Sequence, residues 1–219
     1  MATTTKEYSA FDYAYSWYNQ TLFDSTLPNC LITLQRHRLA YGYYWPNRFQ
    51  HRQQHEQTTD EIALNPDAFV GHPDKEILCT LVHEMAHLWQ QHFGKPGKRG
   101  YHNMEWASKM ELIGLMPSDT GLPGGKRTGY AMSDYAIPGG PFEIVTEKLL
   151  ATGFVVNWQS NERQLRAIGS EAQTTTATPT MPKSRNKTKY SCHNCGLNAW
   201  AKPKARLICG DCQRIMSAT

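Results

Sequence analysis

His83, Glu84 and His87 form the sequence His-Glu-Met-Ala-His, whose residue types and spacing suit metal chemistry. In a helix, residues four apart lie one turn above each other, so both imidazoles can reach one Zn²⁺ ion. Glu84 is rotated by about 100° from His83, which takes it off the metal but leaves it within reach of a water there. This is the position of the general base in a zinc hydrolase.

The residues around this motif predict an amphipathic helix over 73–93. Its apolar side chains fall within an arc of about 140°, and both histidines lie outside that arc. One face is therefore expected to pack on the core while another presents His83 and His87, whereas core histidines would lie inside the arc. The apolar set is Ile77, Leu78, Leu81, Val82, Met85, Leu88 and Trp89.

A catalytic zinc ion needs a third protein ligand, with the fourth position left for water. His102 is the favoured residue because it follows a glycine-bracketed loop and begins the next helix, so the chain can fold back towards the metal. Glu105, one turn later, is the alternative ligand. His92 lies inside the apolar arc and is interpreted as a packing or helix-end residue. The other histidines of this region are expected in exposed loops: His37, His51, His55 and His72.

A second candidate metal site consists of four cysteines near the C-terminus, in two Cys-x-x-Cys pairs: Cys192, Cys195, Cys209 and Cys212. Such pairs predict a closed, tetrahedral zinc site of four thiolates with a structural role, because no ligand position stays open. A module this small cannot build its own core, so zinc is expected to supply much of its folding free energy. Cys30 and Cys79 are isolated, and the placement of all six cysteines favours metal sites over disulfides.

Charge is distributed unevenly along the 219 residues. Residues 1–171 hold 15 Lys or Arg and 18 Asp or Glu, a net charge of −3, whereas residues 172–219 hold 8 and one, a net charge of +7. A basic tail favours a polyanionic partner, most simply nucleic acid, although a solvated tail explains the charge equally well. Cations interleaved with aromatic side chains are typical of surfaces that bind single-stranded nucleic acid. The candidate contacts are Lys187, Lys189, Trp200, Lys202, Lys204 and Arg206, and a protein-docking module is the alternative.

The remaining sequence predicts the elements that position these sites. Composition, with 40% hydrophobic and 19% charged residues, indicates a globular main body. Helices are predicted over 7–24, 73–93, 103–115 and 142–150, and strands over 30–35, 41–45, 61–65 and 154–158. The Gly- and Pro-rich segment 117–141 is predicted as an ordered loop or lid, and 170–189 as a linker. The N-terminus lacks a signal-peptide pattern and no apolar run is long enough to span a bilayer, so a cytoplasmic protein is expected.

In this order, the features resemble the SprT-like (Spartan) zinc metalloproteases. The matching residues are Leu22-Phe23-Asp24, Leu27-Pro28, the strand at Leu31, Tyr41-Gly-Tyr-Tyr, the strand at Glu61, the His83–His87 helix, and His102 with Trp106. The resemblance covers most of 7–115 and 190–215, and departs at Asn103, where the family usually has glycine. It implies an α+β, zincin-like domain over 1–169, with a small sheet packed on the active-site helix. A flexible basic linker over 170–189 and a zinc ribbon over 190–219 follow.

The resemblance further implies a peptidase that cuts proteins attached to DNA, with one catalytic and one structural zinc ion per chain. The residues alone support less, namely a zinc-activated water with Glu84 as its general base. Tyr101, Tyr130 and Tyr135 are candidates by residue type for stabilising the transition state. The alternative function is a nucleic-acid-binding or adaptor protein whose first zinc site is structural or inactive. The intact Glu84 favours the peptidase, because a structural site does not need it.

Overall fold

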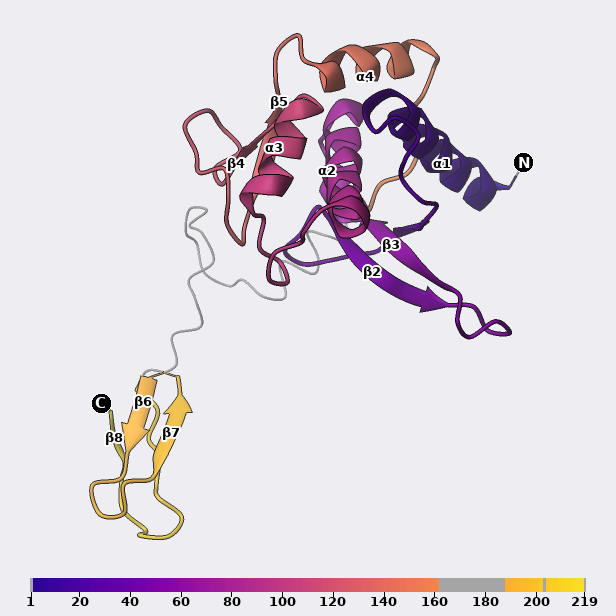
Figure 1. Ribbon diagram of the computed structural model, residues 1–219. Coiled ribbons are helices and arrows are strands. Elements are labelled where there is room, and N and C mark those ends of the chain that lie inside the picture. The colour runs from indigo at the N-terminus through magenta and orange to yellow at the C-terminus, as the bar shows by residue number, and fades with distance from the viewer. Residues whose placement is uncertain (1, 162–187, 203, 219) are drawn as a thin grey trace. The chain divides into compact units, whose positions relative to one another are not determined.

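The computed structural model describes residues 2–161, 188–202 and 204–218, which belong to two compact units, 1–171 and 172–219. The first unit is mixed α+β, as predicted (Figure 1). Its helices are α1 (Thr3–Leu22), α2 (Asp74–Phe93), α3 (Met104–Leu112) and α4 (Pro141–Ala151), with a 3₁₀ turn at Pro66–Phe69. Its strands are β1 (Leu31–Leu34), β2 (Gly42–Gln50), β3 (Thr58–Leu64), β4 (Leu115–Ser118) and β5 (Ser133–Ala136). Among the described residues, none of the helices combines the length and the apolar composition of a membrane span.

The helix α2 is the central element of the first unit. It lies between α3 and α1, with α4 above them in the view (Figure 1). It also packs on a three-stranded sheet of order β1–β3–β2, in which β1 runs parallel and β2 antiparallel to β3. The predicted apolar arc is confirmed, because Ile77, Leu78, Leu81 and Val82 are among its buried side chains. The sequence pattern therefore places α2 with one face in the core and another turned to the cleft described below.

The aromatic face predicted for the first helix is also confirmed. Phe11, Tyr15, Tyr18 and Leu22 are all buried on α1. Tyr18 stacks on Phe142 of α4, with ring centroids 5.9 Å apart, and its hydroxyl shares a 2.8 Å hydrogen bond with the hydroxyl of Thr146. These contacts fix α4 on α1, and both helices contribute side chains to the same core as α2.

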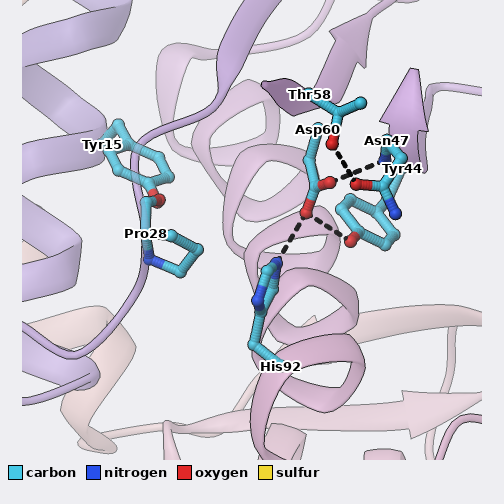
Figure 2. A network of polar contacts seen from close by, with 7 residues as sticks. All are labelled: Tyr15, Pro28, Tyr44, Asn47, Thr58, Asp60 and His92. Carbon is cyan, nitrogen blue, oxygen red and sulfur yellow. Dashed lines mark hydrogen bonds and ion pairs between the residues drawn. The ribbon is translucent and has the colours of Figure 1, made fainter. Parts of the chain in front are cut away.

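The edge strand β2 is longer than predicted and is held by a buried carboxylate. Its register shifts between Trp45 and Phe49, where Asn47 adopts a left-handed φ of 49°. Asp60 of β3 accepts hydrogen bonds from the Asn47 N–H at 2.7 Å, the Tyr44 hydroxyl at 2.7 Å and His92 Nε2 at 2.8 Å (Figure 2). These donors outweigh burial and lower the pKa of Asp60, so the bulge is tied to the C-terminal end of α2.

Two predictions made from the sequence differ from the structure. Within 117–141, predicted as a loop or lid, β4 ends and β5 forms, and the two strands pair antiparallel. The strand predicted over 154–158 is wrong. There the N–H of Val156 donates to Asp74 at 3.3 Å and the N–H of Trp158 to Glu7 at 3.4 Å. Side chains therefore take the place of a neighbouring strand as partners for this segment.

The second unit is a small antiparallel sheet of order β7–β6–β8, made of β6 (Thr188–Ser191), β7 (Asn198–Ala201) and β8 (Ser217–Ala218). Its buried cluster consists of Tyr190, Cys192, Cys209 and Met216. Half of that cluster is cysteine, and this already indicates what holds the unit together. Most of the linker predicted over 170–189 lies outside the described residues.

Candidate metal centres

Three histidine side chains converge from two neighbouring helices of the first unit. His83 and His87 come from α2, and His102 directly precedes α3. One ligand nitrogen from each lies within 4.8 Å of the other two, and the Nε2 atoms of His83 and His102 are 3.3 Å apart. The structure thus brings together the three residues that the sequence proposed as ligands.

This arrangement fits a zinc ion. Two nitrogens bound to one ion at about 2.0–2.1 Å with a tetrahedral angle lie about 3.3 Å apart. The other ring nitrogens are already engaged, since His83 Nδ1 donates to Asp134 Oδ2 at 2.6 Å and His102 Nδ1 donates to the Gly129 carbonyl at 3.1 Å. Each such bond places the proton on Nδ1 and leaves Nε2 free to bind a metal.

The position of His102 depends on contacts that hold the loop after α2. Its backbone exchanges two hydrogen bonds with Gly129, from N to O at 2.8 Å and from the Gly129 N back to its own O at 3.1 Å. Asn103 caps α3, because its Oδ1 accepts the Trp106 N–H at 3.1 Å while its Nδ2 donates to the Lys95 carbonyl at 3.0 Å. With a φ of −90° at Asn103, this position does not require the glycine that the family usually has.

A buried indole contacts all three imidazoles. Trp106 of α3 is fully buried, and its ring lies 4.8, 5.1 and 4.4 Å from the rings of His83, His87 and His102. Contact from one rigid surface limits the rotation of all three rings. The aromatic residue four positions after His102 therefore helps to keep the three ligands in place.

The structure places neither Glu105, the alternative ligand, nor His92, interpreted as a packing or helix-end residue, with the three histidines. Glu105 accepts the Lys95 N–H at 2.6 Å and a Gln90 Nε2–H at 2.7 Å, so its carboxylate holds the loop after α2. His92 contacts Asp60 instead (Figure 2). The histidines expected in loops are exposed and also lie apart from the cluster: His37, His51, His55 and His72.

Glu84 is buried beside the histidine cluster. Burial, with the charge of Asp134 added, raises its pKa to about 7, against the opposing effects of His83 and the Tyr44 N–H. The strand β2 comes this close because Gly42 has no side chain. A Cβ there would lie 2.9 Å from the Ala63 carbonyl oxygen and 3.3 Å from Glu84 Oε1. A carboxylate with a pKa near neutrality suits general acid–base catalysis.

The environment also favours the neutral form of two of the three imidazoles. Burial and the neighbouring His83 lower the pKa of His102 to about 4, and burial lowers that of His87 well below its usual value. Both imidazoles are therefore neutral at pH 7, which is the form that binds a metal. Burial also lowers the pKa of His83. The hydrogen bond with Asp134 and the charges of nearby carboxylates outweigh burial there, so the pKa of His83 is raised.

The site opens into a cleft of about 1380 Å³. The cleft is bordered by β2, by the loop over 96–101 and by the segment over 130–136. Tyr101, Tyr130 and Tyr135 all line it, and the rings of Tyr101 and Tyr130 are 5.1 Å apart. The cleft therefore offers room for a chain-like substrate beside the histidines and brings the three candidate tyrosines to its walls.

Reasoning from the sequence missed Asp134, which lies on β5 and holds His83. A signal was present, because a histidine that binds a metal usually gives its second N–H to a carboxylate or a carbonyl. The segment predicted as a loop or lid contains two acids, Asp119 and Asp134. A search for a partner to His83 could have singled out this pair.

The four cysteines of the second unit also meet. One sulfur from each lies within 4.8 Å of the other three, and the sulfurs of Cys195 and Cys209 are 3.5 Å apart. Zinc–sulfur bonds of about 2.3 Å place two tetrahedral ligands about 3.8 Å apart, far beyond a disulfide bond. Backbone N–H groups of Cys195 and Asn194 lower the pKa of Cys192 to about 7, which favours a thiolate. The cluster therefore fits a zinc ion with all four positions filled by protein.

The candidate nucleic-acid contacts of the second unit are exposed where they are described. Trp200 is 60% exposed, so it does not pack into the small core, and it pairs across the strands with Lys189. Lys202, Lys204 and Arg206 are exposed as well. Lys187 lies outside the described residues.

Comparisons with known proteins identify the family to which the chain is similar. A family model described as the SprT-like family matches residues 12–126, slightly more than half of the chain. Over 59 residues the chain is 44% identical to a protein described as an uncharacterized protein in the mucB 3' region of Salmonella typhimurium, covering 27% of this chain and 78% of that protein. No solved structure matches. The family match includes the three histidines and Glu84, and ends before Asp134.

Proposed function

The chain belongs to the SprT-like family, which supports a metalloprotease type of function in general, and we propose that it is a zinc-dependent peptidase acting on DNA-associated or DNA-crosslinked proteins. His83, His87 and His102 would hold the catalytic zinc ion, with Glu84 as the general base. The four cysteines would hold a second, structural zinc ion. The observation that carries this proposal is the buried Glu84 beside three converging imidazoles.

The chemistry follows from the ligand set and the base. Zinc bound by three protein ligands lowers the pKa of water to about 7 and polarises a carbonyl group. Glu84 takes the proton from the attacking water at its carboxylate and passes it to the nitrogen of the leaving amine. Its pKa near neutrality suits both steps, since the group can accept and release a proton at pH 7.

The proposal for a DNA-associated substrate depends on the second unit and on the family resemblance. Exposed Trp200 can stack on a base, and the exposed cations around it can neutralise phosphates. Such a unit would bring the peptidase to proteins that are attached to DNA. Selectivity would then come from the DNA, with little demand on the side chains of the cleft.

The test replaces Glu84 with glutamine, which keeps the size of the side chain but removes the base. Glu84→Gln is expected to bind as much zinc as the wild type and to lose at least about 10²–10⁴-fold in cleavage of a protein crosslinked to single-stranded DNA. Glu147→Gln, at an exposed glutamate of α4 that does not line the cleft, is the matched control and should retain cleavage. Equal cleavage by the wild type and Glu84→Gln would contradict the proposal.

The alternative is an adaptor that binds nucleic acid and whose histidine site is structural. A structural zinc site has four protein ligands, whereas the described residues bring only three to this cluster. The same assay separates the two functions. An adaptor would bind the DNA-linked protein without cutting it, in the wild type as well as in Glu84→Gln.

A further inference from the structure

Cys79, Asp134 and His83 form a chain of contacts that ends at the candidate metal site. Cys79 and His83 are four residues apart on α2, so their side chains point the same way from successive turns. The Cys79 thiol donates to Asp134 Oδ1 at 2.7 Å, and His83 Nδ1 donates to Asp134 Oδ2 at 2.6 Å. Each oxygen of one carboxylate thus has its own donor on α2.

The thiol can act only as the donor in this chain. A carboxylate has no proton to give, and burial together with the charge of Asp134 keeps the pKa of Cys79 well above its usual value. The proton therefore stays on sulfur and points at Oδ1. Since Asp134 is only 8% exposed at its side chain, few water molecules can replace this donor.

We propose that Cys79 is a positioning residue of the metal centre, whose thiol fixes the Asp134 carboxylate and through it the ring of His83. With one donor alone, the carboxylate could rotate about its Cβ–Cγ bond and take Oδ2 away from Nδ1. With two donors one turn apart, it has a single favourable rotation. This rotation sets the His83 ring so that Nε2 points at the site where His102 Nε2 also points, 3.3 Å away.

The inference rests on the proposed function only in that His83 binds the metal. Cys79 lines the same cleft but is not among the clustered ligand residues. A buried cysteine can also serve simply as a small apolar side chain that fills the core. The two roles differ in one measurable quantity, because only a positioning residue changes metal affinity through Asp134.

The experiment measures Co²⁺ and Zn²⁺ affinity of the histidine site in the full-length chain. Cobalt bound by nitrogens and cobalt bound by four thiolates absorb differently, so the two sites can be titrated separately. Removing a direct partner of a metal-binding histidine typically costs about 10–100-fold in affinity, and Cys79→Ala is expected to cost less, about three- to tenfold. Cys79→Ser, which restores a donor, should recover most of this loss.

Two comparisons make the test specific. Cys30→Ala is the matched control, since Cys30 is also a partly buried, isolated cysteine packed against the same core, and it should leave metal affinity unchanged. In a chain that already carries Asp134→Ala, adding Cys79→Ala should change the affinity by less than about twofold, because residues that act through one contact are not additive. If Cys79→Ala does not fold, Cys79→Val fills the space without a donor and takes its place.

Unchanged affinity in the donor-free variant would overturn the inference, and so would equal losses with and without Asp134. A serine variant as weak as the alanine variant would also contradict it. These outcomes differ from a failure of the proposed function. If the wild type binds no metal at the histidines, the proposed function fails, whereas normal metal binding and cleavage in every Cys79 variant would remove the positioning role alone.

Discussion

The two candidate metal centres differ in what surrounds them. The histidine site lies at the surface of a core that is complete without it, in which α1, α2, α3 and α4 bury large apolar and aromatic side chains. In the second unit, Cys192 and Cys209 are themselves half of the buried cluster. Under the proposed function, a metal at the first site would serve catalysis, whereas a metal at the second would serve folding.

The two sites also differ in the residues that hold the candidate ligands in place. The imidazoles are held by Asp134, by the Gly129 carbonyl and by Trp106, which come from separate parts of the first unit. The sulfurs are supported from within the two Cys-x-x-Cys segments themselves: backbone N–H groups of Cys195 and Asn194 bond Cys192, and the Asn194 side chain donates to Cys212 at 3.2 Å. The first unit is ordered and can preorganise an open site. The second unit needs the ion to bring its two Cys-x-x-Cys pairs together.

The largest effect is expected from breaking the cysteine site. Cys209→Ser should unfold the second unit, because structural zinc binding contributes about 10–16 kcal/mol of apparent free energy in small zinc modules. Calorimetry should show an unchanged melting transition for the first unit, and the zinc content should fall by one ion per chain. A folded second unit in this variant, seen as dispersed amide NMR signals, would show that this unit does not need its metal to fold.

A smaller effect is expected from Asp134 in the first unit. Asp134→Ala should weaken zinc binding at the histidine site about 10–100-fold without unfolding the unit. Chelator competition followed by zinc analysis measures this change. Asp119→Ala, the other acid of the same segment, is the control and should bind zinc as the wild type does. Unfolding of the first unit on loss of its metal would mean that this site, too, is structural.

The next prediction sharpens the role of the second unit. Trp200→Ala should weaken binding of single-stranded DNA by about 1–3 kcal/mol, the usual worth of one stacked base. Fluorescence anisotropy at two salt concentrations measures it, and the salt dependence should persist because the cations remain. Tight binding that is insensitive to both this variant and salt would favour the protein-docking role.

The smallest effect is expected at Asn103, which caps α3. Asn103→Gly restores the residue usual in the family and should cost about 0.5 kcal/mol of unfolding free energy, since glycine is itself a tolerable cap. Urea denaturation of the first unit provides the measurement. A loss of several kcal/mol would show that the bond from Asn103 to Lys95 is essential to the position of His102.

The parts of the fold that could be predicted from the sequence are those with a strong local pattern. Seven apolar residues at helical spacing predicted α2, and two Cys-x-x-Cys pairs predicted the second centre. The pairing of β4 with β5 could not be predicted in this way, because both strands have four residues and lie in a stretch rich in Gly and Pro. Asp134 was missed for the same reason.

The strand that was wrongly predicted over 154–158 shows that a clear local pattern can also mislead. Its residues are apolar and aromatic as in a strand, but the described residues offer no neighbouring strand to pair with it. Glu7 and Asp74 accept its N–H groups instead, from helices far away in the sequence. A local pattern can predict extended backbone but not the partner of that backbone. The same holds for the histidines. Their spacing suits a metal, but contacts with residues far away in the sequence are needed to hold them in position.

Zinc analysis of the purified chain tests whether the histidines and the cysteines each bind a metal ion. Two zinc ions per chain are expected in the wild type, and one in either His83→Ala or Cys209→Ser. Of these two variants, only Cys209→Ser should keep peptidase activity on an unattached, unfolded protein substrate. Two ions in His83→Ala, or one ion in the wild type that is lost with Cys209→Ser, would contradict the account.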